Sequence, residues 1–262
     1  MDKSTIGGLV LAALGILGGL LIEGGSLVQI MQPTAAMIVF GGTFGAVMVQ
    51  FPLSVVLAAV KRISNVFLEP VRNPGAVIDE MLRYAHKARR EGIVSLDNDI
   101  PSVTDPFLKK SLMLAVDGTE AQELRSMMEL EMDNLSEHEE KVPQVFEAAG
   151  GYAPTIGIIG AVLGLIQVMQ HLDKIDEVGR GIAVAFVATI YGVASANILF
   201  LPSAGKLKIR IREEQVTRQM MLEGVVSILE GMNPRMLENK LLGFLAEKKE
   251  STTEASGDGE PK

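Results

Sequence analysis

The 262-residue sequence contains no cysteine, no tryptophan and only three histidines. Without cysteine the chain can form neither a disulfide framework nor a thiolate metal site, and the redox compartment cannot be inferred. Three scattered histidines argue against a protein metal site. The formal net charge of -8 argues against nucleic acid as a partner, because phosphate binding needs a concentrated basic face.

The sequence also lacks the short motifs that mark common enzymes. It contains no GxSxG, P-loop or HExxH pattern, and no histidine is paired with a nucleophile that we can name. The sequence therefore lacks the residues that hydrolysis or phosphoryl transfer would need at a minimum. We expect a protein that is not an enzyme and that carries no cofactor or metal.

Charge is missing from long stretches of a chain that is 48% hydrophobic. Crossing a bilayer as a helix takes about 20 apolar residues, and the uncharged runs approach or exceed that length. The first run has no cleavage pattern of a signal peptide, so we read it as a retained span. We predict an all-α membrane protein with four transmembrane helices: spans 6–22 and 33–52 in a hairpin over 1–60, and spans 153–172 and 181–202 in a second hairpin over 148–205.

Between and after the hairpins the composition is that of soluble helices. In the segment 61–147, Asn73-Pro74 and Asp105-Pro106 are typical helix starts, and Gly92 and Gly118 are typical helix ends. A third helix opens near Thr119, and its acidic outer face is interpreted as a solvated surface. We predict further helices over 206–249 and a disordered tail over 250–262.

Basic residues follow the second and fourth uncharged runs closely. Because Lys and Arg near membrane exits mark the cytoplasmic side, the segments 61–147 and 206–249 are predicted to be cytoplasmic. Four spans then place both termini in the cytoplasm. The basic residues are Lys61, Arg62 and Arg72 after the second run, and Lys206, Lys208, Arg210, Arg212 and Arg218 after the fourth.

Small residues recur at helical spacing in the third and fourth spans. One interpretation is close packing of the two helices within the chain. The other is a groove for a partner helix or an ion path, because small residues leave room alongside a helix. The stripes are Ala153, Gly157, Gly160, Ala161 and Gly164 in the third span, and Ala185, Ala188, Thr189, Gly192, Ser195 and Ala196 in the fourth.

The predicted spans hold no ionisable side chain except Glu23 and His171 at their outer edges. Proton or sodium passage usually needs such a group at membrane depth, so a second protein would have to supply the carboxylate. The chain itself offers hydroxyl groups, at Thr155, Thr189 and Ser195. These can line an ion path or bond back to their own helix.

Two prolines flank the second hairpin. Pro154 lies near the start of the third span, and Pro202 ends the uninterrupted run of the fourth. They mark either simple helix boundaries or a pair of hinges that couple the membrane to the cytoplasmic part.

Several segments together carry a family resemblance: MDKSTIGGL, VFGGTFGAV, ARREGIVSLD, AVDG, AAGGYAPTIGIIGAVLGLI, ATIYGVASANILFLP and EGMNPRMLENKL. With the order of spans and cytoplasmic helices, they resemble MotA, the flagellar motor stator subunit, over nearly the whole chain. The resemblance implies a homopentamer around a MotB-like single-span subunit that supplies an ion-binding aspartate. It also implies torque on the rotor protein FliG, driven by inward ion flow, and a place in the bacterial inner membrane.

The resemblance assigns roles to individual residues. Arg89 or its neighbour Arg90 corresponds to a rotor-facing arginine, and Asp97 corresponds to an acidic rotor-facing residue. Pro154 and Pro202 correspond to torque-coupling prolines, Thr189 corresponds to a threonine beside the ion path, and Thr155 is a further candidate for it. The small-residue faces would then form a wall against the partner's helix.

Ala161 bears on the transported ion. Sodium-driven relatives tend to read GMIGTLVGL where this sequence reads GIIGAVLGL, so Ala161 replaces a threonine hydroxyl that could bind sodium. We therefore expect transport of H+ rather than Na+. Two other functions are weighed against the stator: a non-motor proton-driven energiser of the ExbB/TolQ type, and a passive membrane scaffold. ExbB and TolQ resemble the membrane helices but lack the GMNPR segment.

Overall fold

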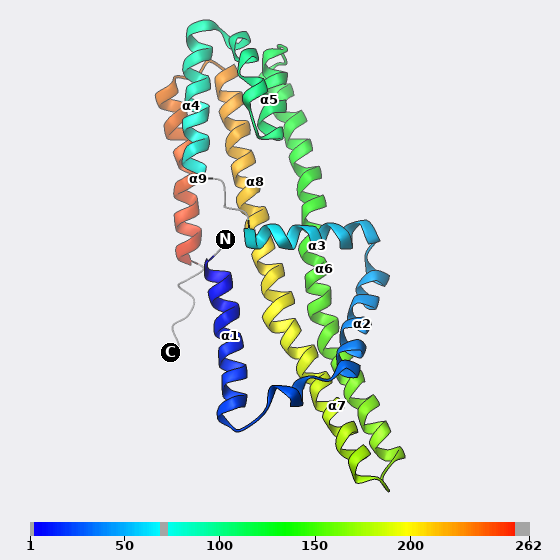
Figure 1. The fold of residues 1–262 in the computed structure, drawn as a ribbon. Coiled ribbons are helices and arrows are strands. Elements are labelled where there is room, and N and C mark those ends of the chain that lie inside the picture. The colour runs from blue at the N-terminus through cyan, green and yellow to red at the C-terminus, as the bar shows by residue number, and fades with distance from the viewer. Residues whose placement is uncertain (1–2, 69–72, 255–262) are drawn as a thin grey trace. The chain divides into compact units, whose positions relative to one another are not determined.

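The computed structural model describes residues 3–68 and 73–254, and within these ranges it is helical and contains no strand (Figure 1). The all-α prediction is confirmed. Arg72 and residues 255–262 of the predicted tail lie outside the described residues. The long helices are α1 (Lys3–Ile22), α2 (Pro33–Gln50), α3 (Leu53–Leu68), α4 (Pro74–Glu91), α5 (Pro106–Val116), α6 (Ala121–Gln170), α7 (Ile175–Ala194), α8 (Leu201–Leu229) and α9 (Pro234–Glu254).

The chain forms two compact units. One comprises Met1–Pro70 and His138–Ile209 and is called the membrane unit below; the other comprises Val71–Glu137 and Arg210–Lys262 and is called the charged unit. Helices α6 and α8 contribute to both. The predicted boundary at 147/148 is therefore not a helix boundary, because Pro143 and Pro154 both lie inside α6. A proline removes one backbone hydrogen bond, and here the helix continues past each one.

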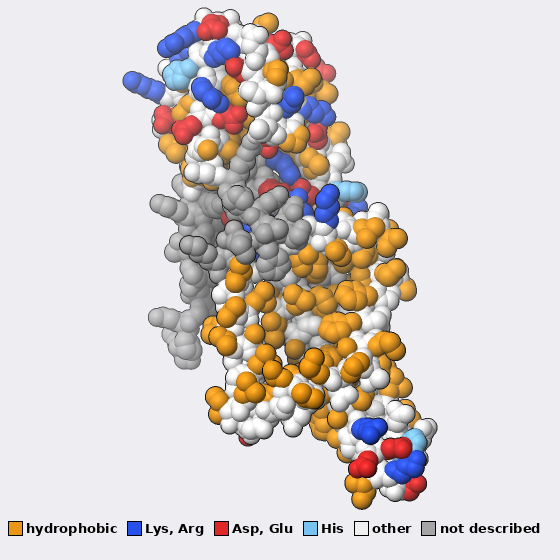
Figure 2. Space-filling view, in the orientation of Figure 1, with side chains coloured by type: hydrophobic (Ala, Val, Ile, Leu, Met, Phe, Trp, Pro, Cys, Tyr) orange, Lys and Arg blue, Asp and Glu red, His pale blue; other side chains and the backbone are white. Residues whose placement is uncertain are grey.

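Within the described residues, four helices are long and apolar enough to cross a membrane, as the sequence predicts. They are α1, α2, the later part of α6, and the continuous helix that starts with α7. In Figure 2 the visible side chains over much of the membrane unit are hydrophobic. Such a surface needs lipid or another protein to cover it.

The apolar residues that follow the second span form a separate helix. Helix α2 ends at Gln50, Phe51 is extended, and α3 begins at Leu53. Figure 1 shows α3 running across α6 and α8. Val56 and Ala59 of α3 pack in one core cluster with Phe146 of α6 and Leu207 of α8, so α3 belongs to the membrane unit.

The core of the charged unit consists of large side chains. It draws on α4, the short helix η2 (Ile93–Asn98), α5, the first turns of α6, the last turns of α8 and on α9, and includes Met81, Leu96, Leu108, Leu112, Leu124, Met128, Met221, Leu237 and Leu241. An ion-pair network joins three of these helices. Arg125 of α6 and Lys240 of α9 both contact the carboxylate of Glu223 in α8.

The end of the chain departs from the predicted tail. Helix α9 runs to Glu254, so the first residues of the tail, 250–254, are helical rather than disordered. The polar composition that suggests disorder does not stop a helix that has already formed from extending by a further turn.

Candidate functional site

The small-residue faces of α6 and α7 pack against each other. A side chain at Gly192 would place its Cβ 2.5 Å from the carbonyl oxygen of Ala153, and one at Gly164 would lie 2.7 Å from that of Gly181. Gly157 likewise approaches the carbonyl oxygen of Ala188. The glycines therefore allow backbone-to-backbone contact. The interpretation of both stripes as a wall for a partner helix is wrong for these residues, because the chain's own second hairpin covers them.

Helix α2 covers one flank of the α6–α7 pair. A Cβ at Gly42 would lie 2.7 Å from Ile156 of α6, and one at Gly160 would lie 3.4 Å from Ile38. On α7, Ala188 packs with Val39 of α2 in one buried cluster. Helix α2 of the same chain therefore already occupies this flank of the α6–α7 pair.

Ala161 and Thr189 share the opposite flank. Counted at about 100° per residue, Ala161 lies well away from Ile156 on α6, and Thr189 lies well away from the α2-facing Tyr191 on α7. Both are half-buried. The large apolar side chains at the same helical phase are exposed: Ile158, Leu165, Ile182, Phe186 and Val193. We call this surface the open flank.

The candidate hydroxyl groups all bond to their own helices. Thr189 Oγ1 donates to the carbonyl oxygen of Ala185 at 3.2 Å, and Ser195 Oγ donates to that of Gly192 at 3.2 Å. Thr155 Oγ1 donates to the carbonyl oxygen of Tyr152 at 2.8 Å. A hydroxyl that donates in this way keeps its oxygen lone pairs. These can accept a hydrogen bond from a hydrated proton or bind a cation.

The structure does not bring Thr155 to the other two ion-path candidates. Thr155 is exposed, and its helical phase is opposite that of Gly157 and the α7-facing stripe. Ala161 and Thr189 both lie on the open flank, whereas Thr155 faces away from α7. Sequence spacing alone did not separate Thr155 from Ala161 and Thr189.

Both prolines lie inside helices. Pro154 is within α6, and Pro202 is in the first turn of α8, which continues α7 through a π-helical turn, Ser195–Phe200. Pro202 therefore does not end the fourth helix. In the π turn, Leu201 N–H donates to the carbonyl oxygen of Ala196, five residues back. Such a turn accommodates the loss of the hydrogen bond that Pro202 cannot donate, because proline has no backbone N–H.

The prolines lie close to one tight helix crossing. A Cβ at Gly150, whose carbonyl loses its usual donor at Pro154, would lie 2.6 Å from Leu201, the residue before Pro202. The structure thus brings the two proline-weakened stretches of backbone to the same level of the membrane unit.

Two polar residues in the spans are missed by the sequence interpretation. Tyr191 donates its hydroxyl hydrogen to the carbonyl oxygen of Ile30 and accepts from Gln32 N–H at 3.3 Å, which holds the link between α1 and α2 against α7. Thr43 of α2 is fully buried, and in the described residues its Oγ1 is the one buried side-chain oxygen or nitrogen without a hydrogen-bond partner. A polar residue inside an uncharged run is the signal that could have found both.

Arg89, Arg90 and Asp97 lie around one turn of the charged unit. The two arginines occupy the last turn of α4, and Asp97 lies in the short helix η2 (Ile93–Asn98) that follows Gly92. Gly92 has a φ of 84°, a left-handed conformation that favours glycine and reverses the chain. All three charged side chains are exposed.

Two side-chain bonds and one buried side chain hold this turn in place. Lys87 Nζ bonds Asp99 Oδ2 at 2.7 Å, and Ser95 Oγ donates to the carbonyl oxygen of Gly92 at 2.7 Å. Leu96 is fully buried in the core beside the exposed Asp97. Three exposed charges are thus presented from a rigid support. Across the described ranges 3–68 and 73–254, no cluster of three or more His, Asp or Glu side chains could hold a metal ion.

Comparison with known proteins covers almost the full chain. Residues 6–92 match the Motility protein A N-terminal family, and residues 99–220 match the MotA/TolQ/ExbB proton channel family. Motility protein A of Bacillus subtilis is 37% identical over 95% of this chain and 92% of its own length.

Two solved structures have a similar fold. A chain in the structure of C. jejuni MotAB superposes with a TM-score of 0.88 at 34% identity, over 93% of this chain and 96% of that one. A chain in the flagellar MotAB stator complex from Bacillus subtilis gives 0.86 at 36% identity, over 96% and 99%. The sequence segments, the four spans and these similarities agree, and the chain belongs to the motility protein A family.

Proposed function

We propose that this protein is the ion-conducting stator subunit of a bacterial flagellar motor. It assembles as a homo-oligomer, a pentamer by family resemblance, with a MotB-like subunit, and couples inward cation flow to torque on FliG. The observation that carries this proposal is the full-length similarity to chains of two MotAB complexes. The match of residues 6–92 to the motility family's N-terminal model favours the motor over an ExbB/TolQ-type energiser.

The composition of the spans supports a division of labour between two subunits. Around the open flank this chain supplies apolar side chains, Ala161 and the hydroxyl of Thr189, but no carboxylate. An ion-binding aspartate then comes from the partner's helix, which lies against the open flank rather than against the glycine stripes. Several copies of the open flank would enclose that helix and exclude lipid from it.

Protons are the proposed cargo. Ala161 offers no oxygen where sodium-driven relatives tend to carry threonine, so one possible sodium ligand is missing. Swimming speed should follow the proton gradient and resist a sodium-channel blocker. Speed that tracks external sodium while the proton gradient is intact would contradict this assignment.

The proposed orientation follows from the basic residues. Lys61 and Arg62 follow the second span, and Lys206 and Lys208 follow the fourth, so the charged unit and both termini face the cytoplasm across the inner membrane. Arg89, Arg90 and Asp97 then face the rotor, with Arg89 preferred over Arg90 by the family resemblance. Pro154 and Pro202 provide the bendable backbone through which the membrane helices move the charged unit.

The function is tested by expressing this chain with its MotB-like neighbour in a bacterium that lacks its own stators. We expect swimming to be restored. Arg89→Glu and Asp97→Lys should lower torque at unchanged membrane levels, because exposed charge reversals cost little folding stability. Arg212→Glu, an exposed reversal on α8, serves as the control. Well-assembled complexes that never generate torque, together with transport driven by the proton gradient, would favour the energiser.

A further inference from the structure

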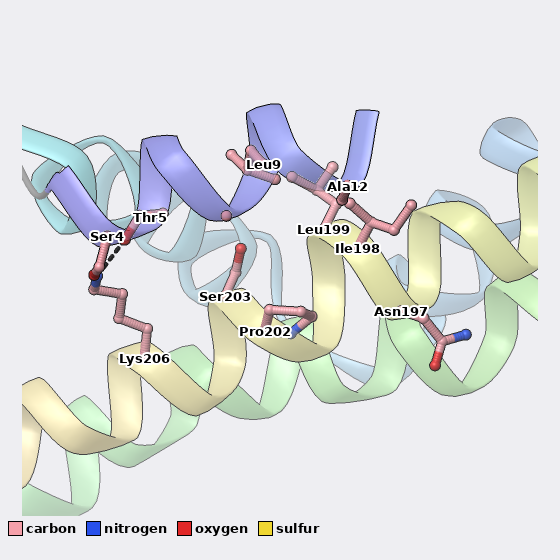
Figure 3. A pocket seen from close by; sticks show the side chains of 11 residues that line it. Ser4, Thr5, Leu9, Ala12, Asn197, Ile198, Leu199, Pro202, Ser203 and Lys206 are labelled. Atoms are coloured by element: carbon pink, nitrogen blue, oxygen red, sulfur yellow. Dashed lines mark hydrogen bonds between the residues drawn. The ribbon is translucent and has the colours of Figure 1, made fainter. Parts of the chain in front are cut away.

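A cavity lies between the first turns of α1 and the stretch of helix around Pro202. Its volume is about 320 Å³, within the range of small-ligand sites. Figure 3 shows Ser4 and Thr5 of α1 opposite Lys206 of α8 at one end, and Leu9 and Ala12 opposite Ile198 and Leu199 farther along. The cavity is therefore polar at the Lys206 end and mostly apolar at the other, where Asn197 also lies with its amide donating to the carbonyl oxygen of Val193 on its own helix.

The polar end is built around the ammonium group of Lys206. Lys206 is half-buried, and its Nζ donates a hydrogen bond to Thr5 Oγ1. Ser203, one turn earlier on α8, is 8% exposed and directs its hydroxyl toward α1 (Figure 3). Lys206 brings a positive charge to this end, and the hydroxyl of Ser203 can donate a hydrogen bond. This end is suited to an anion with several oxygens.

The apolar end has room and opens onto hydrophobic surface. A Cβ at Gly8, which lines the cavity, would meet no atom within 4 Å. Beyond the cavity, one turn past Ala12 on the same face of α1, Ile16 is 55% exposed. A hydrocarbon chain that leaves the cavity would therefore continue along an apolar helix surface instead of entering water.

We propose that this cavity binds an anionic phospholipid, with the headgroup phosphate at Lys206 and the first acyl carbons beside Leu9 and Ile198. A basic pocket between transmembrane helices at the membrane edge is suited to anionic headgroups. The cavity is smaller than a whole phospholipid, so most of each acyl chain lies outside it. The proposal needs only a membrane-spanning chain and does not depend on ion conduction; the proposed orientation assigns the lipid to the cytoplasmic leaflet.

The position of the cavity gives the lipid a mechanical consequence. Pro202 lines it, and the π turn Ser195–Phe200 ends two residues before Pro202. A lipid seated there would span α1 and the weakened stretch of the fourth helix. Anionic lipid content would therefore influence how freely that stretch bends.

The test measures phosphatidylglycerol bound to the full-length protein, purified with its co-expressed partner, by native mass spectrometry. Lys206→Gln should weaken binding about fivefold, from the roughly 1 kcal/mol expected for one lysine near an anionic headgroup. Lys208→Gln is the matched control, since Lys208 is exposed and paired with Glu147 at 2.5 Å. Lys206→Arg should retain the lipid.

A second pair of variants blocks the apolar end without touching charge. Gly8→Leu should displace the lipid, whereas Gly7→Leu should not, because Gly7 does not line the cavity although its Cβ would also meet nothing within 4 Å. Only variants with an unchanged melting temperature in detergent are compared, and Lys206→Arg supplies a folded reference if Lys206→Gln is unstable.

Four results would overturn the proposal. Equal binding in Lys206→Gln and Lys208→Gln would remove Lys206 from the site. Equal binding of phosphatidylcholine would remove headgroup charge as the determinant. Competition by inorganic phosphate at the affinity of the lipid would indicate a free-anion site. Binding only after the complex has been dissociated to single chains would show that a neighbouring copy fills the cavity.

Discussion

The two units bury their helices in opposite ways. In the membrane unit, α6 and α7 meet through Gly157, Gly164, Gly192 and neighbouring alanines, and many large apolar side chains point outward. In the charged unit the large side chains, such as Leu112, are buried and the charges point outward. The difference follows from the surroundings: water drives large apolar groups inward, whereas lipid does not, so close backbone contact must hold membrane helices together.

The largest loss of stability is expected from creating a cavity in the core of the charged unit. Leu112→Ala should lower the free energy of unfolding of this unit by about 2–5 kcal/mol, because Leu112 is fully buried. Hydrogen exchange of the α4 and α5 amides in the full-length protein measures this change. Leu130→Ala is the control, since Leu130 is 64% exposed. Equal losses in both variants would contradict the assignment of the core.

Adding a methyl group, rather than removing side-chain atoms, should destabilise the membrane unit. Gly192→Ala adds a Cβ only 2.5 Å from a backbone oxygen of Ala153, so the helices must separate, at a cost of about 1–3 kcal/mol. The melting temperature in detergent measures the cost. Gly151→Ala, whose Cβ meets nothing within 4 Å, should be neutral or stabilising. If both glycines tolerate alanine equally, close α6–α7 packing is not what holds the hairpin together.

A smaller effect is expected from the ion-pair network of the charged unit. Hydrogen bonding from Arg125, then from Lys240, lowers the pKa of Glu223 to about 2, against the opposing effect of its burial. Glu223→Gln should cost about 1–2 kcal/mol at neutral pH. Unfolding of α8 and α9, followed by hydrogen exchange, measures the loss, with the exposed Glu238→Gln as control.

The same carboxylate predicts a pH dependence. Because its pKa is lower when folded than the usual value of about 4.3 in an unfolded chain, its contribution is complete above that value. The contribution should be lost as pH falls toward about 2. The slope of stability against pH in this range should be shallower in Glu223→Gln. An unchanged slope would mean that Glu223 is not paired in solution.

The smallest effect on stability, about 0.5 kcal/mol or less, is expected on the open flank. Thr189→Ala should lower ion flux through the assembled complex while leaving its melting temperature nearly unchanged. Thr155→Ala should affect flux less, because Thr155 faces away from α7. Proton uptake by proteoliposomes measures both. Unchanged flux in Thr189→Ala would indicate that its hydroxyl only caps the carbonyl of Ala185.

Much of the fold can be predicted from local signals. Uncharged runs give the four spans, and Asn73, Asp105 and Gly92 give helix ends, since their caps act within a turn. Sequence could not show that α6 continues through Pro143, or that a π turn carries the fourth helix through Pro202, because helix continuity there depends on packing. Nor could it show which glycine face meets which helix.

The candidate site was predictable to a similar degree. The resemblance names Thr189 and Ala161 as ion-path candidates and the turn with Arg89 and Asp97 as rotor-facing, and these roles stay predictions. It could not separate Thr155 from the other two, because helical phase has meaning only once the position of α2 is known. The buried hydroxyl of Thr43 and the role of Tyr191 also depend on contacts between distant parts of the chain.

The central claim is that a partner helix lies on the open flank and not against the glycine stripes. Because the chain has no native cysteine, single cysteines at Ala161, Thr189 and Ile38 can be oxidised against cysteines placed along the MotB-like helix in membranes. Disulfides at 161 and 189, with none at 38 on the α2 flank, are the predicted result. Efficient cross-linking at 38, with none at 161 or 189, would contradict the account.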